Sequence, residues 1–261
     1  MKLKMKLNSL KRILYLIIFM VLPLLSFGNQ QPEALYAAAN SYYAKGQFQH
    51  ALDNYKKILA GGTASAELYY NLGNASYKTG DLASALLYYE KARKLSPNDE
   101  DLKANIRLAN SKTTDKVDEV PELFLISWWK AVYLSASTDT FAILSILLVL
   151  AGSALLITYF FAHAVLIKKA SFYSAVVLLF FGLAVLFIAN RQVSYFEHNR
   201  QGIVFNSPVA VKSAPSDDAR NLFIIHSGTK VSIIDTKKNW IRITLTNGNE
   251  GWMKVEDLKE I

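Results

Sequence analysis

Four histidines are the residues best suited to acid–base or metal chemistry in this chain, because the sequence contains no cysteine. They are His50, His163, His198 and His226, and they are scattered along the sequence. None has a second ligand at the spacing of a metal site. No Gly-x-Ser-x-Gly elbow or phosphate-binding loop accompanies them. We therefore expect a protein that is not an enzyme and that needs no metal or cofactor.

The cysteine count and the charge exclude further classes. Without cysteine the chain forms no disulfide bond, thiolate nucleophile or lipoprotein anchor. The formal net charge of +8 would suit nucleic acid if it were gathered on one folded face. Five of those charges, however, come from the first twelve residues, Lys2, Lys4, Lys6, Lys11 and Arg12. The remainder is too evenly balanced to neutralise many phosphates, so we expect no nucleic-acid partner.

The amino terminus has the pattern of a signal peptide over residues 1–28. The basic start is followed by the apolar run Ile13–Phe27 and by the small residues Ser26 and Gly28, which suit a cleavage site after Gly28. The apolar run is shorter than the roughly 20 residues of a spanning helix. The alternative, an uncleaved anchor, would place the following residues on the same side of the membrane.

Two later segments are long enough to form a transmembrane hairpin over residues 140–190. The runs Phe141–Phe161 and Ala170–Asn190 contain no Asp, Glu, Lys or Arg. Lys168 and Lys169 lie in the short turn expected between them, which the positive-inside rule places in the cytoplasm. Residues 29–139 and 192–261 would then both face the periplasm of a cell with an inner (cytoplasmic) membrane. The alternative is a pair of buried helices in a soluble protein.

An aromatic segment precedes the first span, within a linker over residues 115–139. Residues 124–134 contain Trp128, Trp129 and Tyr133 beside Lys130, a combination that suits the headgroup level of a bilayer. We expect an interfacial helix there, in contact with lipid. An ordinary helix that packs between domains is the alternative.

The region from Ala66 to Asp99 resembles a tetratricopeptide repeat. The matching signature residues are Tyr69, Leu72, Gly73, Ala85, Tyr89, Ala92 and Pro97, whereas Ser76 stands where an aromatic residue is usual. A weaker copy lies 34 residues earlier and aligns Asn40 with Asn74 and Tyr55 with Tyr89. Asp99–Lys112 is expected to be a single capping helix. Residues 29–114 are thus expected to form an all-α solenoid of two repeats and a cap.

The resemblance implies a protein-binding groove along the first helix of each repeat. Spacings of three and four place its residues on one helix face. The candidate groove residues are Tyr36, Asn40, Tyr43, Tyr70, Asn74, Tyr77 and Lys78, flanked by Glu33, Ala44 and Glu67. Amides can hold an extended peptide backbone and aromatic rings supply rigid contact area. The alternative is that these side chains only pack against neighbouring helices.

Residues 191–261 change to the alternating pattern of β-strands. The segments Val209–Lys212, Lys230–Asp235 and Asn239–Leu245 alternate, and Asn247-Gly248 suits a hairpin turn. The region resembles a bacterial SH3-like domain, a small all-β barrel. We expect Trp240 and Trp252 to be core residues, with Trp240 as the floor of a ligand groove being the alternative.

The whole order of segments resembles the BatE-type proteins of the Bacteroides aerotolerance (Bat) operon. It predicts a multidomain membrane protein: a signal peptide, a tetratricopeptide-repeat solenoid, a two-helix hairpin and an SH3-like barrel. The resemblance implies a non-enzymatic scaffold that binds membrane-anchored or periplasmic proteins, in particular other Bat proteins, and that serves survival of oxidative stress. The alternative is a receptor or sensor whose barrel binds peptidoglycan.

Overall fold

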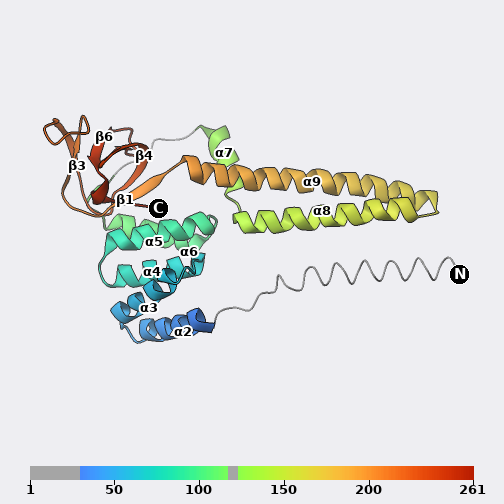
Figure 1. Cartoon of the computed structure of the whole chain (residues 1–261), viewed down its shortest axis with the longest axis horizontal. Helices are drawn as coiled ribbons and strands as arrows, with labels where there is room; N and C mark the ends of the chain where they lie inside the picture. The colour runs from blue at the N-terminus through green and yellow to red at the C-terminus, as the bar shows by residue number, and fades with distance from the viewer. Residues whose placement is uncertain (1–29, 117–122) are drawn as a thin grey trace.

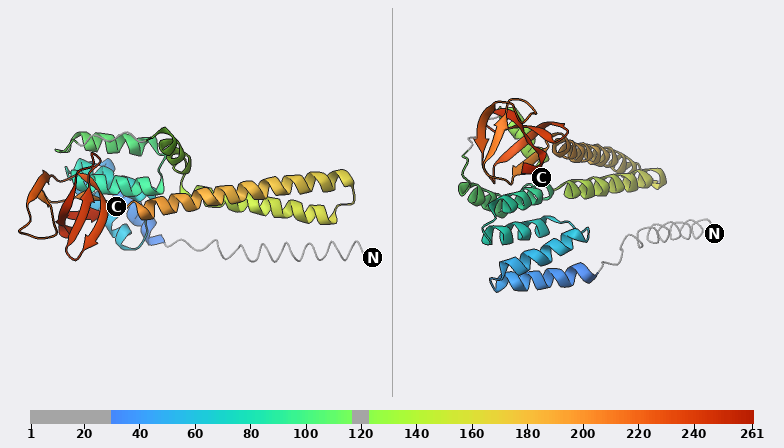
Figure 2. Two further views of the ribbon diagram at one scale, coloured as in Figure 1. Left: turned by 90° about the horizontal axis from the view of Figure 1, so that it is seen from above. Right: turned by 60° about the vertical axis from the view of Figure 1, so that its left-hand side comes forward.

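The computed structural model describes residues 30–116 and 123–261, so the expected signal peptide over residues 1–28 lies outside the described residues. Figure 1 shows three parts: a stack of short helices, a small barrel at one end of that stack, and a long helical hairpin that projects away from both. The turn of the hairpin lies at its far end from the solenoid and the barrel (Figures 1 and 2). Both compact parts therefore lie at the same end of the hairpin.

The helical stack is a solenoid of five helices. They are α2 (Gln30–Ala44), α3 (Phe48–Ala60), α4 (Ala66–Lys78), α5 (Leu82–Leu95) and α6 (Glu100–Ser111). Ser65, Asp81 and Asp99 cap α4, α5 and α6, each accepting a hydrogen bond from a backbone N–H in the first turn. Helices α2 to α5 form two helix pairs and α6 follows as a single helix, as the 34-residue period predicts.

The crossing of α4 and α5 explains the glycine at its centre. A Cβ on Gly73 would lie 2.4 Å from the Cδ1 atom of Tyr89, a distance that no side chain tolerates. The Tyr89 ring itself is buried, with 2% of its surface exposed. Only glycine lets the aromatic ring fill this crossing.

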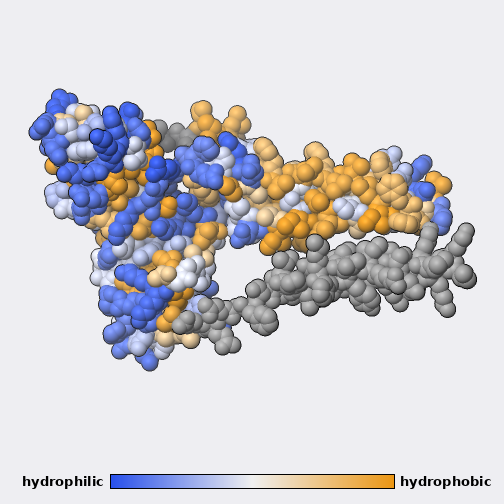
Figure 3. All heavy atoms as spheres, in the orientation of Figure 1, coloured by the Kyte–Doolittle hydropathy of each residue, from blue (hydrophilic) through white to orange (hydrophobic). Residues whose placement is uncertain are grey.

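The hairpin consists of α8 (Thr138–Phe161) and α9 (Val165–His198), which run side by side. Small residues form their contact. Ser145 donates a hydrogen bond of 2.8 Å to the carbonyl of Gly182, and a Cβ on Gly182 would lie 2.8 Å from Val149 Cγ2. In the most apolar window of each helix only 17% of the residues are buried. The remaining apolar surface faces outward, as Figure 3 shows in orange, unlike a core helix of a soluble protein.

The helix bounds differ from the expected hairpin at both ends of α9. The chain turns at residues 162–164, so Lys168 and Lys169 lie near the start of α9 and not in the turn itself. Helix α9 also continues past Asn190 to His198, beyond the expected start of the barrel region at residue 191. The barrel begins only three residues later, at Gln201. A single continuous helix therefore joins the hairpin to the barrel.

A short helix, α7 (Phe124–Tyr133), packs against α9 at the base of the hairpin. Gln192 of α9 is fully buried there. Its side chain accepts a hydrogen bond from Thr138 Oγ1 at 2.7 Å and donates one to the carbonyl of Ala136 at 2.9 Å. Both amide atoms of Gln192 are satisfied, which fixes the start of α8 against α9.

Seven antiparallel strands form the barrel, hydrogen-bonded in the order β3-β2-β6-β5-β4-β1-β7. Their bounds are β1 (Gln201–Val204), β2 (Val209–Lys212), β3 (Asn221–Ile225), β4 (Lys230–Lys237), β5 (Trp240–Thr244), β6 (Glu250–Lys254) and β7 (Leu258–Glu260), with a short 3-10 turn at Val255–Asp257. Val211, Ile243 and Met253 are fully buried at its centre. The expected segment Val209–Lys212 is β2, and the other two expected segments overlap β4 and β5.

The barrel docks directly on the solenoid. Ile203 of β1 is fully buried, and it belongs to the apolar cluster of α5 and α6 together with Leu86 and Leu102. Glu90 of α5, almost fully buried, pairs with Lys230 of β4 at 3.0 Å. Helix α6 was expected to cap the solenoid alone, but the barrel covers the exposed face of α5 as well. The single helix α6 leaves part of the apolar side of α5 uncovered, and the barrel packs against that part.

Candidate functional site

The expected groove residues lie on the first helix of each repeat. Tyr36, Asn40 and Tyr43 belong to α2, and their counterparts Tyr70, Asn74 and Tyr77, with Lys78, belong to α4. Asn40 and Lys78 are exposed, whereas the tyrosines and Asn74 are half-buried. Tyr43 packs edge-on against Phe48 with ring centroids 5.1 Å apart. Lys112, at the end of α6, places its Nζ 4.8 Å from the centroid of Tyr77.

A hydrogen-bond pattern that repeats with the solenoid holds the two asparagines. Tyr55 of α3 donates to Asn40 Oδ1 at 2.5 Å, and Tyr89 of α5 donates to Asn74 Oδ1 at 2.7 Å. In each repeat a buried tyrosine of the second helix thus reaches through to the asparagine of the first. Because the carbonyl oxygen is engaged, the orientation of each amide is fixed.

A second repeated bond joins consecutive first helices. Asn71 of α4 donates to the Tyr36 hydroxyl at 2.6 Å, and Asn105 of α6 donates to the Tyr70 hydroxyl at 3.1 Å. The Tyr36 hydroxyl in turn donates to Glu67 Oε1. These bonds tie α2 to α4 and α4 to α6 along the groove.

Sequence reasoning missed four members of this network: Tyr55, Asn71, Tyr89 and Asn105. The signal was present, since Tyr55 and Tyr89, like Asn71 and Asn105, are 34 residues apart. The alignment of the repeats treated Tyr55 and Tyr89 as space-filling residues only. Their hydroxyl groups are what the groove amides bind.

The network raises the pKa of its tyrosines. Burial and the neighbouring Tyr43 and Glu67 raise the pKa of Tyr55 to about 12. The pKa of Tyr89 is raised mainly by burial, and that of Tyr36 by burial together with its bond to Glu67. All three hydroxyls therefore stay protonated at neutral pH and act as donors to their acceptors.

The amide nitrogens of Asn40 and Asn74 keep their donors available. Within the described part of the chain, no hydrogen bond engages Nδ2 of Asn40 or of Asn74, although both carbonyl oxygens are bonded. Beside Asn40 and Tyr36 lies a hollow of about 400 Å³ between α2 and α4. The arrangement offers a row of oriented donors, one per repeat, next to a recess. It suits recognition of backbone carbonyls rather than bond-breaking chemistry.

The barrel carries a second hollow, and here the structure corrects the expected core. Neither Trp240 nor Trp252 belongs to the buried cluster of the barrel; both are half-buried. Trp240 lines a hollow of about 420 Å³ together with Asn239, Lys254 and Glu256. Lys254 places its Nζ 6.0 Å from the centroid of the Trp240 ring. The tryptophans lie at the barrel surface because short β-branched and aliphatic residues already fill the small interior.

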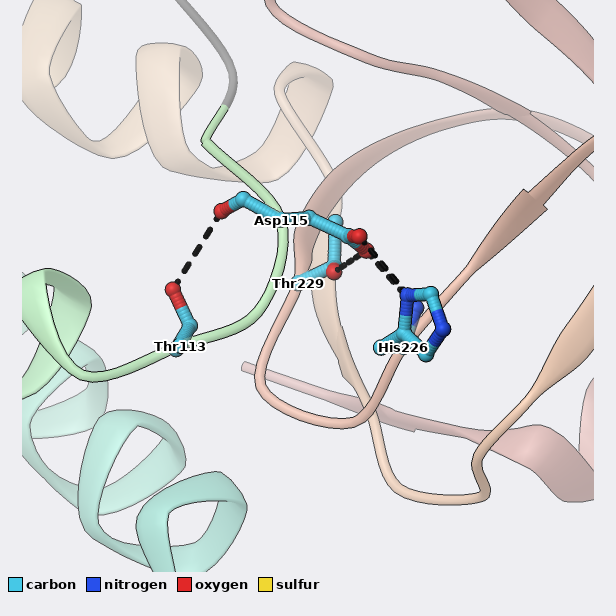
Figure 4. Close-up of polar contacts among 4 residues, drawn as sticks. All are labelled: Thr113, Asp115, His226 and Thr229. Carbon is cyan, nitrogen blue, oxygen red and sulfur yellow. Dashed lines mark hydrogen bonds and ion pairs between the residues drawn. The ribbon is translucent and has the colours of Figure 1, made fainter.

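Figure 4 shows a cluster that superficially resembles a catalytic triad. Asp115, which follows α6, accepts hydrogen bonds from the backbone N–H and the Nδ1 atom of His226 and from Thr229 Oγ1. The threonine donates to the carboxylate and not to the histidine, so no nucleophile is paired with a base. The cluster instead fastens the end of the solenoid to the barrel.

The hydrogen bonds around Asp115 control its ionisation. Burial alone would raise the pKa of this carboxyl group. The bonds from Thr229, from the His226 N–H and from the His226 ring, with the electrostatic attraction of that ring, act in the opposite direction and lower the pKa overall. The carboxylate is therefore ionised at neutral pH.

The residues expected at a membrane interface differ in exposure: some are exposed and others are partly or fully buried. Trp128 is 56% exposed, and α7 presents an apolar outer surface in Figure 3. Trp129 is half-buried. Tyr133 differs from the expectation because it is buried against α9, with its ring centroid 5.4 Å from that of Tyr195. Lys168 and Lys169 are exposed near the turn of the hairpin.

Two segments match family models. A tetratricopeptide-repeat model matches residues 66–99, and a bacterial SH3 domain model matches residues 207–259. No curated protein matches the chain. In the residues that the structure describes, no group of three or more His, Asp or Glu side chains could hold a metal ion.

Solved structures with related folds cover parts of the chain. The C-terminal SH3 domain of myosin IB from Entamoeba histolytica is 25% identical over 24% of this chain and 95% of its own, with a TM-score of 0.19. YrrB, described as a tetratricopeptide-repeat protein with an unusual peptide-binding site, is 19% identical over 74% of this chain and 88% of its own, with a TM-score of 0.31. PcrH, solved with the chaperone binding region of PopB, is 14% identical over 65% of this chain and 97% of its own, with a TM-score of 0.31.

These TM-scores are too low to carry an argument about function. The family models and the observed elements agree on the composition of the chain. It combines a helical tetratricopeptide-repeat region, two apolar helices compatible with a membrane protein, and a carboxyl-terminal SH3-like antiparallel sheet. Tetratricopeptide repeats and bacterial SH3 domains are typically binding modules, and this chain contains one module of each kind.

Proposed function

We propose that this protein is a non-enzymatic scaffold of the inner membrane whose solenoid groove binds extended segments of partner proteins. The observation that carries the proposal is the pair of oriented amides, Asn40 and Asn74, one repeat apart on the groove face. An extended peptide has carbonyl groups at regular intervals and can accept a hydrogen bond from each amide.

The hairpin supports a membrane location. Its outward apolar side chains need an apolar solvent, which the hydrocarbon of a bilayer supplies. Lys168 and Lys169 favour a cytoplasmic turn by the positive-inside rule. Because the solenoid and the barrel lie at the opposite end, both would be in the periplasm. Helix α7, with Trp128 exposed, would then rest at the headgroup level.

The partners would be membrane-anchored or periplasmic proteins. The resemblance of the whole architecture to BatE-type proteins favours other Bat proteins, and with them a role in an envelope complex and in survival of oxidative stress. The chain contains no cysteine, and in residues 30–116 and 123–261 no group of three or more His, Asp or Glu side chains could hold a metal ion. Any such role would therefore pass through the proteins that the scaffold binds.

The hollow at Trp240 favours a second candidate, a receptor that binds peptidoglycan through its barrel. A half-buried tryptophan flanked by Asn239, Lys254 and Glu256 offers a flat apolar surface beside polar groups. Such a surface can bind a sugar or a short peptide of the cell wall. Retention of the chain on purified cell-wall sacculi, and its loss in Trp240→Ala, would favour this candidate.

The test of the scaffold proposal removes the groove amides without leaving buried hydroxyls unpaired. The amide-deleted variant carries Asn40→Ala, Asn74→Ala, Tyr55→Phe and Tyr89→Phe, and its control carries only Tyr55→Phe and Tyr89→Phe. Removing both partners of a buried bond is close to neutral for folding. We expect the two lost donors, at about 1 kcal/mol each, to reduce partner recovery more than about tenfold.

Recovery is measured by co-purification from native membranes followed by mass spectrometry. The control variant should recover more partners than the amide-deleted variant, because its amides remain, and fewer than the parent chain, because the amides lose the hydroxyl groups that orient them. Equal recovery by the amide-deleted variant and its control would contradict the groove proposal. Loss of partners with Trp240→Ala alone would place the binding surface on the barrel.

A further inference from the structure

The groove helices begin with acidic residues, and α4 and α6 end at or beside a lysine. Acidic residues lie in the first turn of each first helix: Glu33 in α2, Glu67 in α4, and Glu100 and Asp101 in α6. Lys78 lies in the last turn of α4 and Lys112 immediately follows α6. The helices of a solenoid run in register, so the groove has an acidic margin and a basic margin with the amides between them.

The recess of about 400 Å³ lies on the acidic margin. Glu33 and Glu67 line it from α2 and α4, and both residues are exposed. Glu67 accepts from the Tyr36 hydroxyl through Oε1, which leaves Oε2 without a bond from the described residues. No Lys or Arg of the described residues pairs with either carboxylate. Among the described residues, no basic side chain therefore compensates the two negative charges at the recess.

The floor and walls of the same recess are apolar or aromatic. Ile58, Leu68 and Ala37 line it, and the Tyr36 ring forms one side. A lysine or arginine side chain combines an aliphatic stem with a cationic head. The stem would cover the apolar floor and the head would lie between the carboxylates. A purely apolar side chain would match the apolar floor but not the carboxylates. An acidic side chain would be repelled by the carboxylates.

Asn40 lines this recess and is also one of the two groove amides whose Nδ2 donor is available. A peptide carbonyl held by Asn40 would place a neighbouring side chain at the mouth of the recess. Side chains of an extended peptide alternate between its two sides. The next side chains would therefore point by turns toward the acidic margin and toward Lys78 and Lys112.

We propose that the recess beside Tyr36 and Asn40 receives a lysine or arginine side chain, so that the groove selects basic extended segments. This inference rests on the proposed peptide-binding role of the groove and adds the charge of its ligand. A carboxylate-bearing segment would meet Glu33 and Glu67 with like charge and is rejected at this position. The selected segment has its basic residue next to the backbone carbonyl that Asn40 binds.

The probe is a random dodecapeptide library displayed on phage and selected on the full chain in detergent micelles. Groove-dependent clones are those that bind the parent chain but not the amide-deleted variant. We expect lysine and arginine to be enriched in these clones over the unselected library. Binding should fall about tenfold or more in Glu33→Gln/Glu67→Gln, which removes two charge-assisted hydrogen bonds while keeping the side-chain shapes.

The matched control is Asp53→Asn/Glu250→Gln, which removes two exposed carboxylates from α3 and from the barrel, away from the recess. It changes the net charge equally and should leave binding within about twofold. Groove-dependent clones without basic enrichment, or equal loss in both double variants, would overturn the inference and leave the peptide-binding role intact. A library that yields no groove-dependent clone would overturn both.

Discussion

Individual hydroxyl groups orient the amides of the proposed groove. Tyr55 and Tyr89 occupy the carbonyl oxygens of Asn40 and Asn74 and leave the amide donors facing outward. An asparagine without such a partner could present either end of its amide. The tyrosines therefore have two roles, since they fill the helix crossings and orient the groove amides.

Ser76 lies in the repeat over Ala66–Asp99, at a position where tetratricopeptide repeats usually have an aromatic residue. It is fully buried, and its Oγ is the one buried side-chain polar atom in the described residues that has no hydrogen-bond partner. An unpaired buried hydroxyl costs free energy that a methyl group does not. The position is thus a weak point in an otherwise satisfied helix pair.

We expect Ser76→Ala to raise the free energy of unfolding of the solenoid by about 1 kcal/mol. Alanine also has the higher helix propensity. Segment-resolved hydrogen exchange of the full chain in detergent measures the effect over α4 and α5. Ser111→Ala, which removes a bonded hydroxyl at the end of α6, is the control and should not stabilise. Faster exchange in Ser76→Ala would contradict this explanation.

At the scale of elements, α9 links the apolar hairpin to the barrel. It continues from the hairpin to within three residues of β1, and Gln192 fixes its base to the start of α8. Immediately after the helix, Arg200 pairs with Glu260 of β7 at 2.6 Å. That pair lowers the pKa of Glu260, chiefly through the hydrogen bond from Arg200. The barrel is thus held close to the hairpin.

The orientation of the hairpin can be tested with fusions to alkaline phosphatase, an enzyme that needs disulfide bonds and is active only in the periplasm. Fusions after Lys112 and after Ile261 should be active, and a fusion after Lys169 should be inactive. The physical reason is the retention of Lys168 and Lys169 on the cytoplasmic side. An active fusion at Lys169 together with an inactive one at Ile261 would contradict the proposed orientation.

Elements with a strong local pattern could be predicted from the sequence. The 34-residue period predicted α2 to α6, and uninterrupted apolar runs predicted the two long helices. Strands β1, β3, β6 and β7 were missed. Strand β1 follows α9 almost without a linker, and β3, with the sequence NLFII, lacks the polar–apolar alternation that marked the predicted strands. The surface position of Trp240 was missed because tryptophan is ordinarily counted as a core residue, whereas smaller side chains fill this barrel.

Contacts between distant segments could not be predicted, because nothing local encodes them. Asp115 lies more than a hundred residues before His226 and Thr229, yet it accepts hydrogen bonds from both. Ile203 looks like any strand residue, but it completes the core of the solenoid. The groove positions came from the repeat period, while the network that orients their amides needed the side-chain geometry.

At the scale of the whole molecule, the solenoid and the barrel form one body. Ile203, the Glu90–Lys230 pair and the bonds of Asp115 span their contact, and Lys94 donates to the carbonyl of Ile261 at 3.0 Å. A partner held in the groove is therefore held at a fixed place relative to the barrel hollow and the hairpin. A fixed arrangement of the two modules suits a scaffold better than an arrangement in which flexible linkers join them.

The lowered pKa of Asp115 makes this contact sensitive to acid. An ionised carboxylate stabilises the folded state when its pKa is lower in that state than in the unfolded chain. Its contribution is fully present above the ordinary aspartate pKa of about 4 and is lost as the pH falls through the lowered value. Stability should therefore decline in acid and not in mild alkali.

We expect Asp115→Asn to lower the free energy of unfolding at pH 7 by about 1–3 kcal/mol, because hydrogen bonds to a charged acceptor are lost. The difference from the parent chain should stay constant down to about pH 5 and shrink below about pH 4. This difference in the free energy of unfolding is measured by urea unfolding, followed by hydrogen exchange of the barrel. Asp53→Asn is the control. A difference as large at pH 3 as at pH 7 would contradict the role of the carboxylate.

The groove as the partner-binding surface is tested most directly by photo-crosslinking in living cells. A photoreactive amino acid replaces Lys78 in the groove, Glu256 beside the barrel hollow, or Lys57 on α3, all of which are exposed. We predict that position 78 yields covalent adducts with envelope proteins and that position 57 does not. Adducts at position 256 in the absence of any at position 78, or equal adducts at positions 57 and 78, would contradict the account.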